Sequence, residues 1–182
     1  MALAAQDHRA AFEVLAGRYL GLLTRYCGKF VGNPRVGEEL AQESLLELWI
    51  QRGRYCARGK LTVYLLTLAR NRCLNHQRAE TRRRRWGFLL GSPAPEEAAE
   101  VAAPAPATDQ LGALLEAERS HRVQQALQRL PDKLREAALL RFDQGLEYPE
   151  IAAIVGRPEA TVRSRVFLAM KALRSELGDP EE

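Results

Sequence analysis

The feature that most constrains the fold is a proline-rich stretch near the middle of the chain. Residues 91–95 (GSPAP) and 104–106 (PAP) place prolines too densely for a helix or a sheet to persist. Residues 91–118 also hold six acidic and no basic side chains. This pattern predicts an acidic, flexible linker over 87–118, including the start of the next helix. The linker would join two small domains, 1–86 and 119–182, which a chain of 182 residues can accommodate.

Apolar residues recur at helical spacing on both sides of this linker. One run extends from Phe12 to Phe30, and residues 32–34 (GNP) end it in a form suited to capping the next helix. No run alternates apolar and polar residues as a half-buried strand does. The sequence therefore predicts an all-α fold. Further helices are expected through Leu40–Trp49, from Leu61 into a basic tract, before Pro131, up to Gly145, over Tyr148–Val155 and over about Glu159–Leu177.

The charge is unevenly distributed. Residues 1–90 hold 16 basic and 7 acidic side chains, whereas residues 119–182 hold 11 and 10. A basic first half indicates a polyanionic partner such as nucleic acid. Composition alone is equally consistent with an arginine-rich, solvated surface.

Several classes of protein are disfavoured by the composition. Cys27, Cys56 and Cys73 are widely spaced and form no Cys-x-x-Cys motif, which argues against a disulfide framework and a zinc site. No apolar run is long enough to span a membrane, and the N-terminus lacks the pattern of a secretory signal. We therefore expect no metal, no cofactor, no membrane insertion and a cytoplasmic location.

The C-terminal segment carries the most specific local pattern. Pro149 suits a first helical turn, and Gly156 suits the left-handed end of a helix. In the next helix an apolar stripe lies on one face, while Arg163, Phe167, Lys171 and Arg174 share another. This arrangement is typical of a helix-turn-helix that reads DNA in the major groove. An ordinary helical hairpin with a solvated basic face is the alternative.

Two helices of the first half carry candidate binding faces. Asn71, Asn75, Arg78 and Arg82 share one face, and Tyr55, Tyr64 and Trp86 lie in or near this segment, which suits single-stranded DNA. We expect Tyr64 to lie in the core, and the alternative for the Asn/Arg face is a solvated basic run. The preceding helix sets Glu38, Glu39, Gln42, Glu43 and Glu47 beside Leu45, Leu46 and Trp49. We expect a protein partner there, although the helix dipole alone accounts for Glu38 and Glu39.

Taken together, these segments resemble the extracytoplasmic-function (ECF, group IV) sigma factors of bacterial RNA polymerase. The resemblance covers about residues 9–86 and 119–177. It is carried by five motifs in order, at residues 37–49 (GEELAQESLLELW), 59–71 (GKLTVYLLTLARN), 127–131 (LQRLP), 148–152 (YPEIA) and 160–166 (ATVRSRV). Their order and spacing across two domains are specific to that family.

The resemblance implies a role for each face. Residues Glu39, Gln42, Glu43, Leu46 and Trp49 would dock on the clamp helices of the largest subunit of core polymerase. Residues Arg54, Tyr55, Arg58, Asn71, Asn75, Arg78 and Arg82 would read and melt the −10 element of promoter DNA. Residues Arg141, Thr161, Arg163, Ser164, Arg165, Phe167 and Lys171 would bind the −35 element. Further implied partners are the flap of the second-largest subunit and an anti-sigma factor.

The sequence also departs from the family pattern. Asn75 stands where aspartate is common, and Leu168 and Met170 stand where arginines are frequent. The first departure bears on promoter preference, and the other two imply that −35 affinity rests more heavily on Arg163 and Arg165.

The sequence also allows two other functions to be compared with this one. A stand-alone helix-turn-helix regulator would bind DNA without polymerase, but it would need neither the acidic helix nor the separate basic one. An enzyme is disfavoured because His8, His76 and His121 lie in unrelated contexts without a nucleophile motif, a phosphate loop or metal-ligand spacing.

Overall fold

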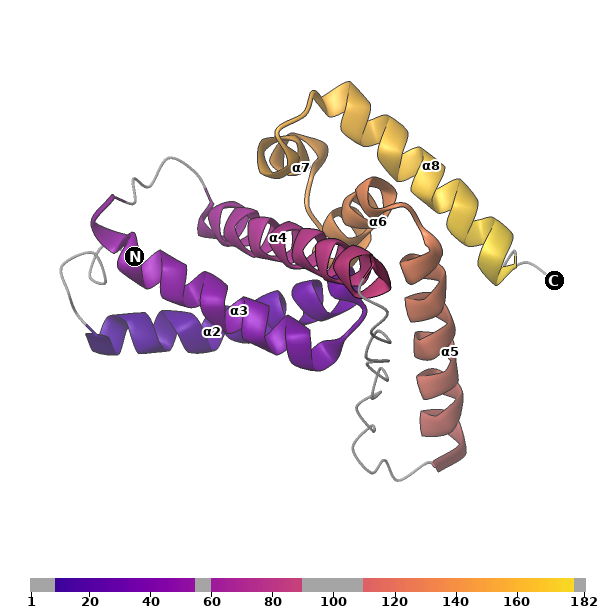
Figure 1. The fold of residues 1–182 in the computed structure, drawn as a ribbon, viewed down its shortest axis with the longest axis horizontal. Coiled ribbons are helices and arrows are strands. Elements are labelled where there is room, and N and C mark those ends of the chain that lie inside the picture. The colour runs from indigo at the N-terminus through magenta and orange to yellow at the C-terminus, as the bar shows by residue number, and fades with distance from the viewer. Residues whose placement is uncertain (1–8, 55–59, 90–109, 179–182) are drawn as a thin grey trace. The chain divides into compact units, whose positions relative to one another are not determined.

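The computed structural model describes residues 9–54, 60–89 and 110–178, and every regular element in these ranges is helical (Figure 1). The chain divides into two compact units with the boundary between residues 100 and 101. The predicted all-helical fold in two parts is confirmed. Most of the predicted linker, residues 90–109, lies outside the described residues. Within the described ranges, no helix combines the length and apolar character that crossing a membrane requires.

The first unit contains α2 (Arg9–Val31), α3 (Pro34–Ile50), the short 3-10 turn η1 (Arg52–Arg54) and α4 (Leu61–Leu89). The chain reverses between α2 and α3 at Gly32, whose φ of 81° suits glycine. Asn33 then caps α3, since its side chain accepts hydrogen bonds from the backbone N–H groups of Arg35 (3.0 Å) and Val36 (3.3 Å). Pro34 occupies the first turn. The predicted break and cap are confirmed.

The core of the first unit lies between these three helices. Its fully buried side chains include Tyr26 and Phe30 from α2, Leu48 from α3, and Leu65 and Leu66 from α4. Helices α2 and α3 approach most closely at two glycines: a Cβ atom on Gly37 would lie 2.4 Å from the Cα atom of Gly28. The close approach fixes how α3 lies against α2 and therefore which face of α3 remains exposed.

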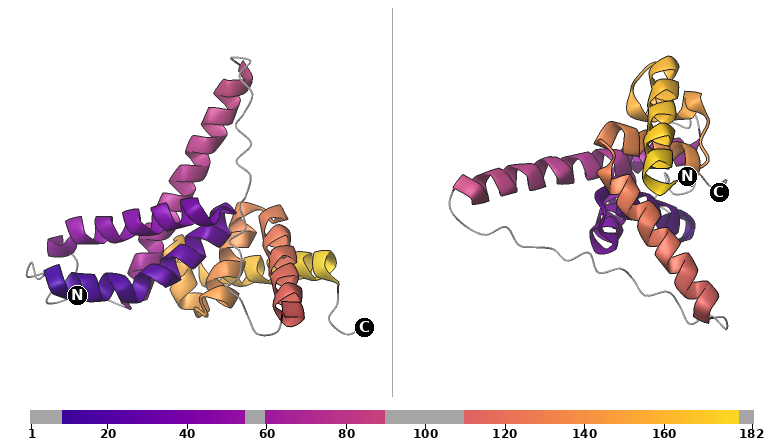
Figure 2. Two further views of the ribbon diagram at one scale, coloured as in Figure 1. Left: turned by 90° about the horizontal axis from the view of Figure 1, so that it is seen from below. Right: turned by 90° about the vertical axis from the view of Figure 1, so that its right-hand side faces the viewer.

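Helix α4 extends well past this core. Residues 81–86 are all exposed, and Figure 2 shows the C-terminal half of α4 projecting away from α2 and α3. The helix ends at Leu89, three residues beyond the end expected for the first domain. An exposed arginine-rich helix end of this kind leaves its cations accessible to a polyanion.

The second unit contains α5 (Gln110–Arg129), α6 (Asp132–Ala138), a π-helical turn η2 (Leu139–Asp143), α7 (Tyr148–Val155) and α8 (Glu159–Leu177). Its core includes Leu139, Leu140, Ile151 and Val162, all at most 2% exposed. Gly156 ends α7 in the left-handed conformation with φ of 63°. The predicted bounds of α7 and α8 and the turn between them are confirmed.

A buried arginine ties α6 to the end of α5. The guanidinium group of Arg135 donates to the carbonyl oxygens of Leu127 (2.9 Å), Gln128 (3.0 Å) and Leu130 (3.0 Å). These carbonyl groups lie at or just beyond the C-terminal end of α5, where a cation is favoured. Burial lowers the pKa of Arg135, and the nearby Asp132 carboxylate opposes the shift. Arg135 thus links α6 to the C-terminal end of α5 within the second unit.

Candidate nucleic-acid interface

The first candidate face lies on α3. Its exposed residues include Glu39, Gln42, Glu43 and Leu46, and the Leu46 side chain is 56% exposed. Their spacing of three and four residues places them together, opposite the buried Leu40, Leu45 and Leu48. An exposed leucine among carboxylates and an amide is suited to a protein partner rather than to nucleic acid.

One arginine of α4 reaches this face. The Arg72 guanidinium contacts Glu47 at 2.9 Å and 3.0 Å and Glu43 at 3.3 Å. The Arg72 and Glu47 side chains are 38% and 25% exposed. Sequence reasoning missed this link, because 25 and 29 residues separate the partners. Its consequence is that the acidic face of α3 and the start of the basic face of α4 are held together.

Trp49 is only half-buried, but it is engaged within the unit. Its ring lies 4.8 Å from the ring of Phe12 in α2, and the guanidinium carbon of Arg52 lies 4.1 Å from the Trp49 ring centroid. The predicted docking role of Trp49 therefore applies to its remaining exposed edge.

The second candidate face lies on α4. Asn71, Asn75, Arg78 and Arg82 are all exposed and follow one another at steps of four, three and four residues. Tyr64 instead faces the core side: it is half-buried, and its hydroxyl donates to the Gln51 side chain at 3.0 Å. The interpretation of Tyr64 as a packing residue is consistent with this contact. The predicted −10 residues Tyr55 and Arg58, and the side chain of Arg54, lie outside the described residues.

The third candidate face lies on α8 in the second unit. Arg163, Ser164, Phe167 and Lys171 are exposed, whereas Thr161 and Arg165 are half-buried. The Phe167 side chain is 69% exposed. The buried Val162, Val166 and Ala169 anchor the opposite face. The helix thus has one face fixed to its unit and one exposed face that carries hydrogen-bond donors and an aromatic ring, a combination suited to a groove of DNA.

The remaining −35 candidate, Arg141, lies in the π-helical turn. It donates to the carbonyl oxygen of Leu146 at 2.8 Å and pairs with Glu147 at 3.0 Å. The hydrogen bond that Arg141 donates to the Glu147 carboxylate is the main cause that raises the pKa of Arg141 above its usual value. Its guanidinium carbon also lies 4.9 Å from the ring centroid of Tyr148.

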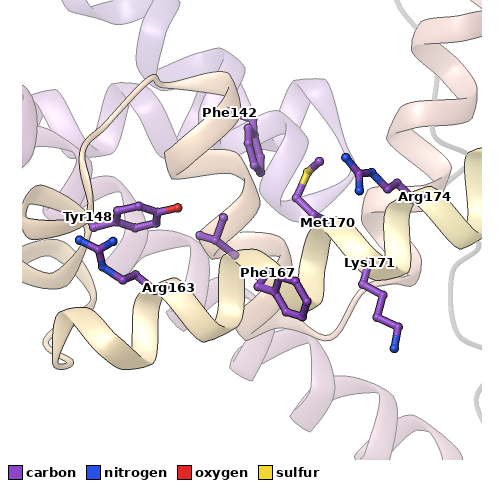
Figure 3. A pocket seen from close by; sticks show the side chains of 8 residues that line it. Phe142, Tyr148, Arg163, Phe167, Met170, Lys171 and Arg174 are labelled. Carbon is purple, nitrogen blue, oxygen red and sulfur yellow. The ribbon is translucent and has the colours of Figure 1, made fainter. Parts of the chain in front are cut away.

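A groove of about 430 Å³ runs beside α8 (Figure 3). Phe142, Tyr148 and Phe167 contribute aromatic walls, and Arg163, Lys171 and Arg174 contribute cations, with Val166 and Met170 completing the lining. The cations of this groove were predicted from the sequence, but Phe142 and Tyr148 were not predicted as surface groups. The sequence feature that could have indicated Tyr148 is its place at the start of the YPEIA motif. Among the described residues, no cluster of His, Cys, Asp and Glu side chains is suited to hold a metal ion.

Comparisons with known proteins cover both units. The family description "Sigma-70 region 2" matches residues 15–83, and "Sigma-70, region 4" matches residues 120–173. The RNA polymerase sigma-H factor of Pseudomonas aeruginosa is 31% identical over 173 residues, which is 93% of this chain and 87% of that protein. The ECF RNA polymerase sigma factor SigK of Mycolicibacterium vanbaalenii is 30% identical over 179 residues, or 96% and 83% of the two chains. The chain belongs to the ECF RNA polymerase sigma factors.

Solved structures agree with the fold of this sigma factor. The chain of the sigma factor RpoE from Bartonella quintana, solved in complex with the anti-sigma factor NepR, superimposes with a TM-score of 0.72 at 23% identity. The match covers 94% of this chain and 99% of that one. As a sigma factor the protein is a transcription initiation factor and not an enzyme, as the sequence predicts. The family match across both units also decides against the stand-alone regulator.

Proposed function

We propose that this sigma factor, of the group IV class, docks on core RNA polymerase through α3 and reads promoter DNA through α4 and α8. The observation that carries the proposal is that each of the three helices buries one face and exposes a second, chemically different one. The α3 face is acidic and apolar, the α4 face presents amides and guanidinium groups, and the α8 face presents cations and an aromatic ring.

The α3 face is proposed to bind the clamp helices of the largest polymerase subunit. Glu39, Gln42, Glu43 and Leu46 supply the exposed contacts, and Trp49 supplies an edge at the C-terminal end of the helix. Acidic side chains around one exposed leucine suit a partner helix that combines cations with an apolar stripe.

The α4 face is proposed to bind and open the −10 element. Side-chain amides pair with base edges, and arginines neutralise phosphates. Asn71 and Asn75 lie next to the buried Ala69 and Cys73, and Arg78 and Arg82 follow toward the exposed C-terminal end of the helix. The predicted contacts of Arg54, Tyr55 and Arg58 complete this site. Unstacking a base step costs a few kcal/mol, which stacking and phosphate contacts would offset.

The α8 face is proposed to bind the −35 element in the major groove. Arg163, Ser164 and Phe167 would lie nearest the bases, because they are exposed in the N-terminal half of α8. Thr161, Arg165, Lys171 and Arg141 would bind phosphates. The exposed side chain of Phe167 suits contact with a thymine methyl group.

Further partners are proposed from the family. The RpoE protein of Bartonella quintana was solved with an anti-sigma factor, and CnrH with the cytosolic domain of CnrY. We propose an anti-sigma factor for this chain as well, contact of the second unit with the flap of the second-largest subunit, and action in the cytoplasm.

Run-off transcription tests the proposal. Purified bacterial core polymerase and fragmented genomic DNA are incubated with and without the full chain. We expect discrete transcripts that appear only with the chain, and their start sites reveal the −35 and −10 sequences. DNA binding by the chain without any dependent transcript would contradict the proposal, and the α3 docking face would be the first assignment to abandon.

A further inference from the structure

Two arginines pack on the ring of Tyr148. The guanidinium carbon of Arg163 lies 4.5 Å from the ring centroid, and that of Arg141 lies 4.9 Å from it. Both distances are within the range of a cation–π interaction. Figure 3 shows the Tyr148 ring and the Arg163 side chain next to each other at one end of the groove. Arg163 is the arginine proposed to read −35 bases, so its orientation bears directly on promoter choice.

The Tyr148 ring is itself held in place. Tyr148 is half-buried and is the first residue of α7. The preceding Glu147 caps α7 reciprocally with Glu150, and the Glu147 N–H donates to the Glu150 carboxylate at 3.0 Å. Arg141 binds Glu147 and the carbonyl oxygen of Leu146. The ring is therefore positioned from both the π-helical turn and the start of α7.

Arg163 is held from a second direction by its own helix. Its Nε donates to a Glu159 carboxylate oxygen at 3.0 Å, one turn earlier in α8, and its Nη2 donates to the same oxygen. The Arg163 side chain is nevertheless 60% exposed. Without the ring, the Glu159 contact alone would hold the guanidinium group only weakly, because an exposed ion pair at this spacing contributes little. The Tyr148 ring supplies the second point of attachment.

We propose that Tyr148 is a positioning residue that holds the Arg163 guanidinium in the orientation in which it meets the −35 bases. The proposal rests on the proposed reading of the −35 element by α8. An arginine that is already ordered in the free protein loses less conformational freedom when it binds. A bidentate contact also tolerates little error in the guanidinium plane. Loss of the ring should therefore weaken both affinity and base discrimination.

The experiment compares four forms of the full chain, each reconstituted with bacterial core polymerase: Tyr148→Leu, Tyr148→Phe, Arg163→Ala and the double variant Tyr148→Leu/Arg163→Ala. Synthetic promoter duplexes carry the −35 sequence found by run-off transcription or one of its single-base substitutions. We expect Tyr148→Leu to weaken binding to the intact −35 sequence by about two- to fivefold, the value of one partly exposed cation–π contact. It should also reduce the difference in affinity between the intact sequence and its single-base substitutions, at the same positions at which Arg163→Ala reduces this difference. Tyr148→Phe keeps the ring face and should keep the preference.

The double variant separates positioning from other roles. If Tyr148 acts through Arg163, Tyr148→Leu should cause no further loss in the Arg163→Ala background. An equal loss in both backgrounds would overturn the proposal, because it would mean that Tyr148 contacts DNA or acts only through the fold. If Arg163→Ala alone leaves the −35 preference unchanged, the base-reading role of α8 is wrong and the positioning role fails with it. Circular dichroism checks that each variant folds. If Tyr148→Leu does not fold, Tyr148→Met takes its place.

Discussion

The close approach of α2 and α3 at Gly37 makes a sharp test of how the docking helix is held. A Cβ atom at Gly37 would lie 2.4 Å from both the Cα and the backbone N of Gly28, and 3.1 Å from the carbonyl carbon of Cys27. All three neighbours are backbone atoms of a buried helix segment, so no side chain can rotate away. Gly37→Ala therefore requires α2 and α3 to move apart.

Two opposing contributions set the size of the effect. Alanine in a helix is favoured over glycine by about 1 kcal/mol. Overpacking a fitted interior costs about 1–3 kcal/mol, and a clash with backbone lies at the upper end or beyond it. We expect Gly37→Ala to lower the free energy of unfolding of the first unit by about 2 kcal/mol. Gly21→Ala is the matched control in α2, because a Cβ atom there meets nothing within 4 Å. It should stabilise the unit by about 0.5–1 kcal/mol.

Urea unfolding followed by tryptophan fluorescence measures this change selectively. Both tryptophans, Trp49 and Trp86, belong to the first unit, so the signal reports on that unit and not on the second. For a slope of about 2 kcal/mol per M urea, a loss of 2 kcal/mol lowers the midpoint by about 1 M. A Gly37→Ala protein at least as stable as the parent would refute the reasoning. So would an equal loss in Gly21→Ala.

Three further predictions concern the proposed interfaces. Glu43→Lys should weaken core polymerase binding at least about tenfold in a pull-down titration, as expected for a central interface residue, whereas the control Glu13→Lys on α2 should bind normally. Normal binding by Glu43→Lys would show that α3 is not the docking face. Arg72→Glu should lower the free energy of unfolding of the first unit, measured in urea, by only about 1 kcal/mol, because solvent partly screens the ion pairs that are lost. The exchange Arg72→Glu/Glu47→Arg should restore most of this loss. Failure to restore it would count against the pairing. Arg82→Gln should reduce the slope of log binding constant against log salt by about 0.7–0.9, the effect of one phosphate contact; an unchanged slope would place Arg82 away from DNA.

Local rules were enough to predict most of the fold. The break at residues 32–34 depends on a glycine, a capping asparagine and a first-turn proline, each of which acts within a few residues. The bounds of α7 and α8 depend likewise on Pro149, Gly156 and the spacing of apolar residues. The exposed faces of α3, α4 and α8 could also be predicted, because helical periodicity alone decides which side chains share a side.

The contacts between helices could not be predicted from the sequence. No periodic rule pairs Arg72 with Glu43 and Glu47, or reveals that Gly28 and Gly37 lie against each other, because these contacts depend on the crossing of two helices. The π-helical turn was predicted as the continuation of an ordinary helix. An extra residue in that turn changes which side chains face outward, and π-helical turns of this kind are frequent at functional sites. The exposed Phe142 of the groove follows from that turn.

The composition of α8 makes the contacts that hold Arg163 important for the proposed binding of DNA. Leu168 and Met170 stand where the family often has arginines; Leu168 is 46% exposed and Met170 lines the groove. With fewer cations on the recognition helix, each phosphate or base contact that remains carries a larger share of the binding free energy. When a recognition surface has few cations, its affinity for DNA depends strongly on whether those cations are already ordered in the free protein. An ordered arginine loses less conformational freedom on binding. The two attachments of Arg163, to Glu159 and to Tyr148, provide that order in this chain.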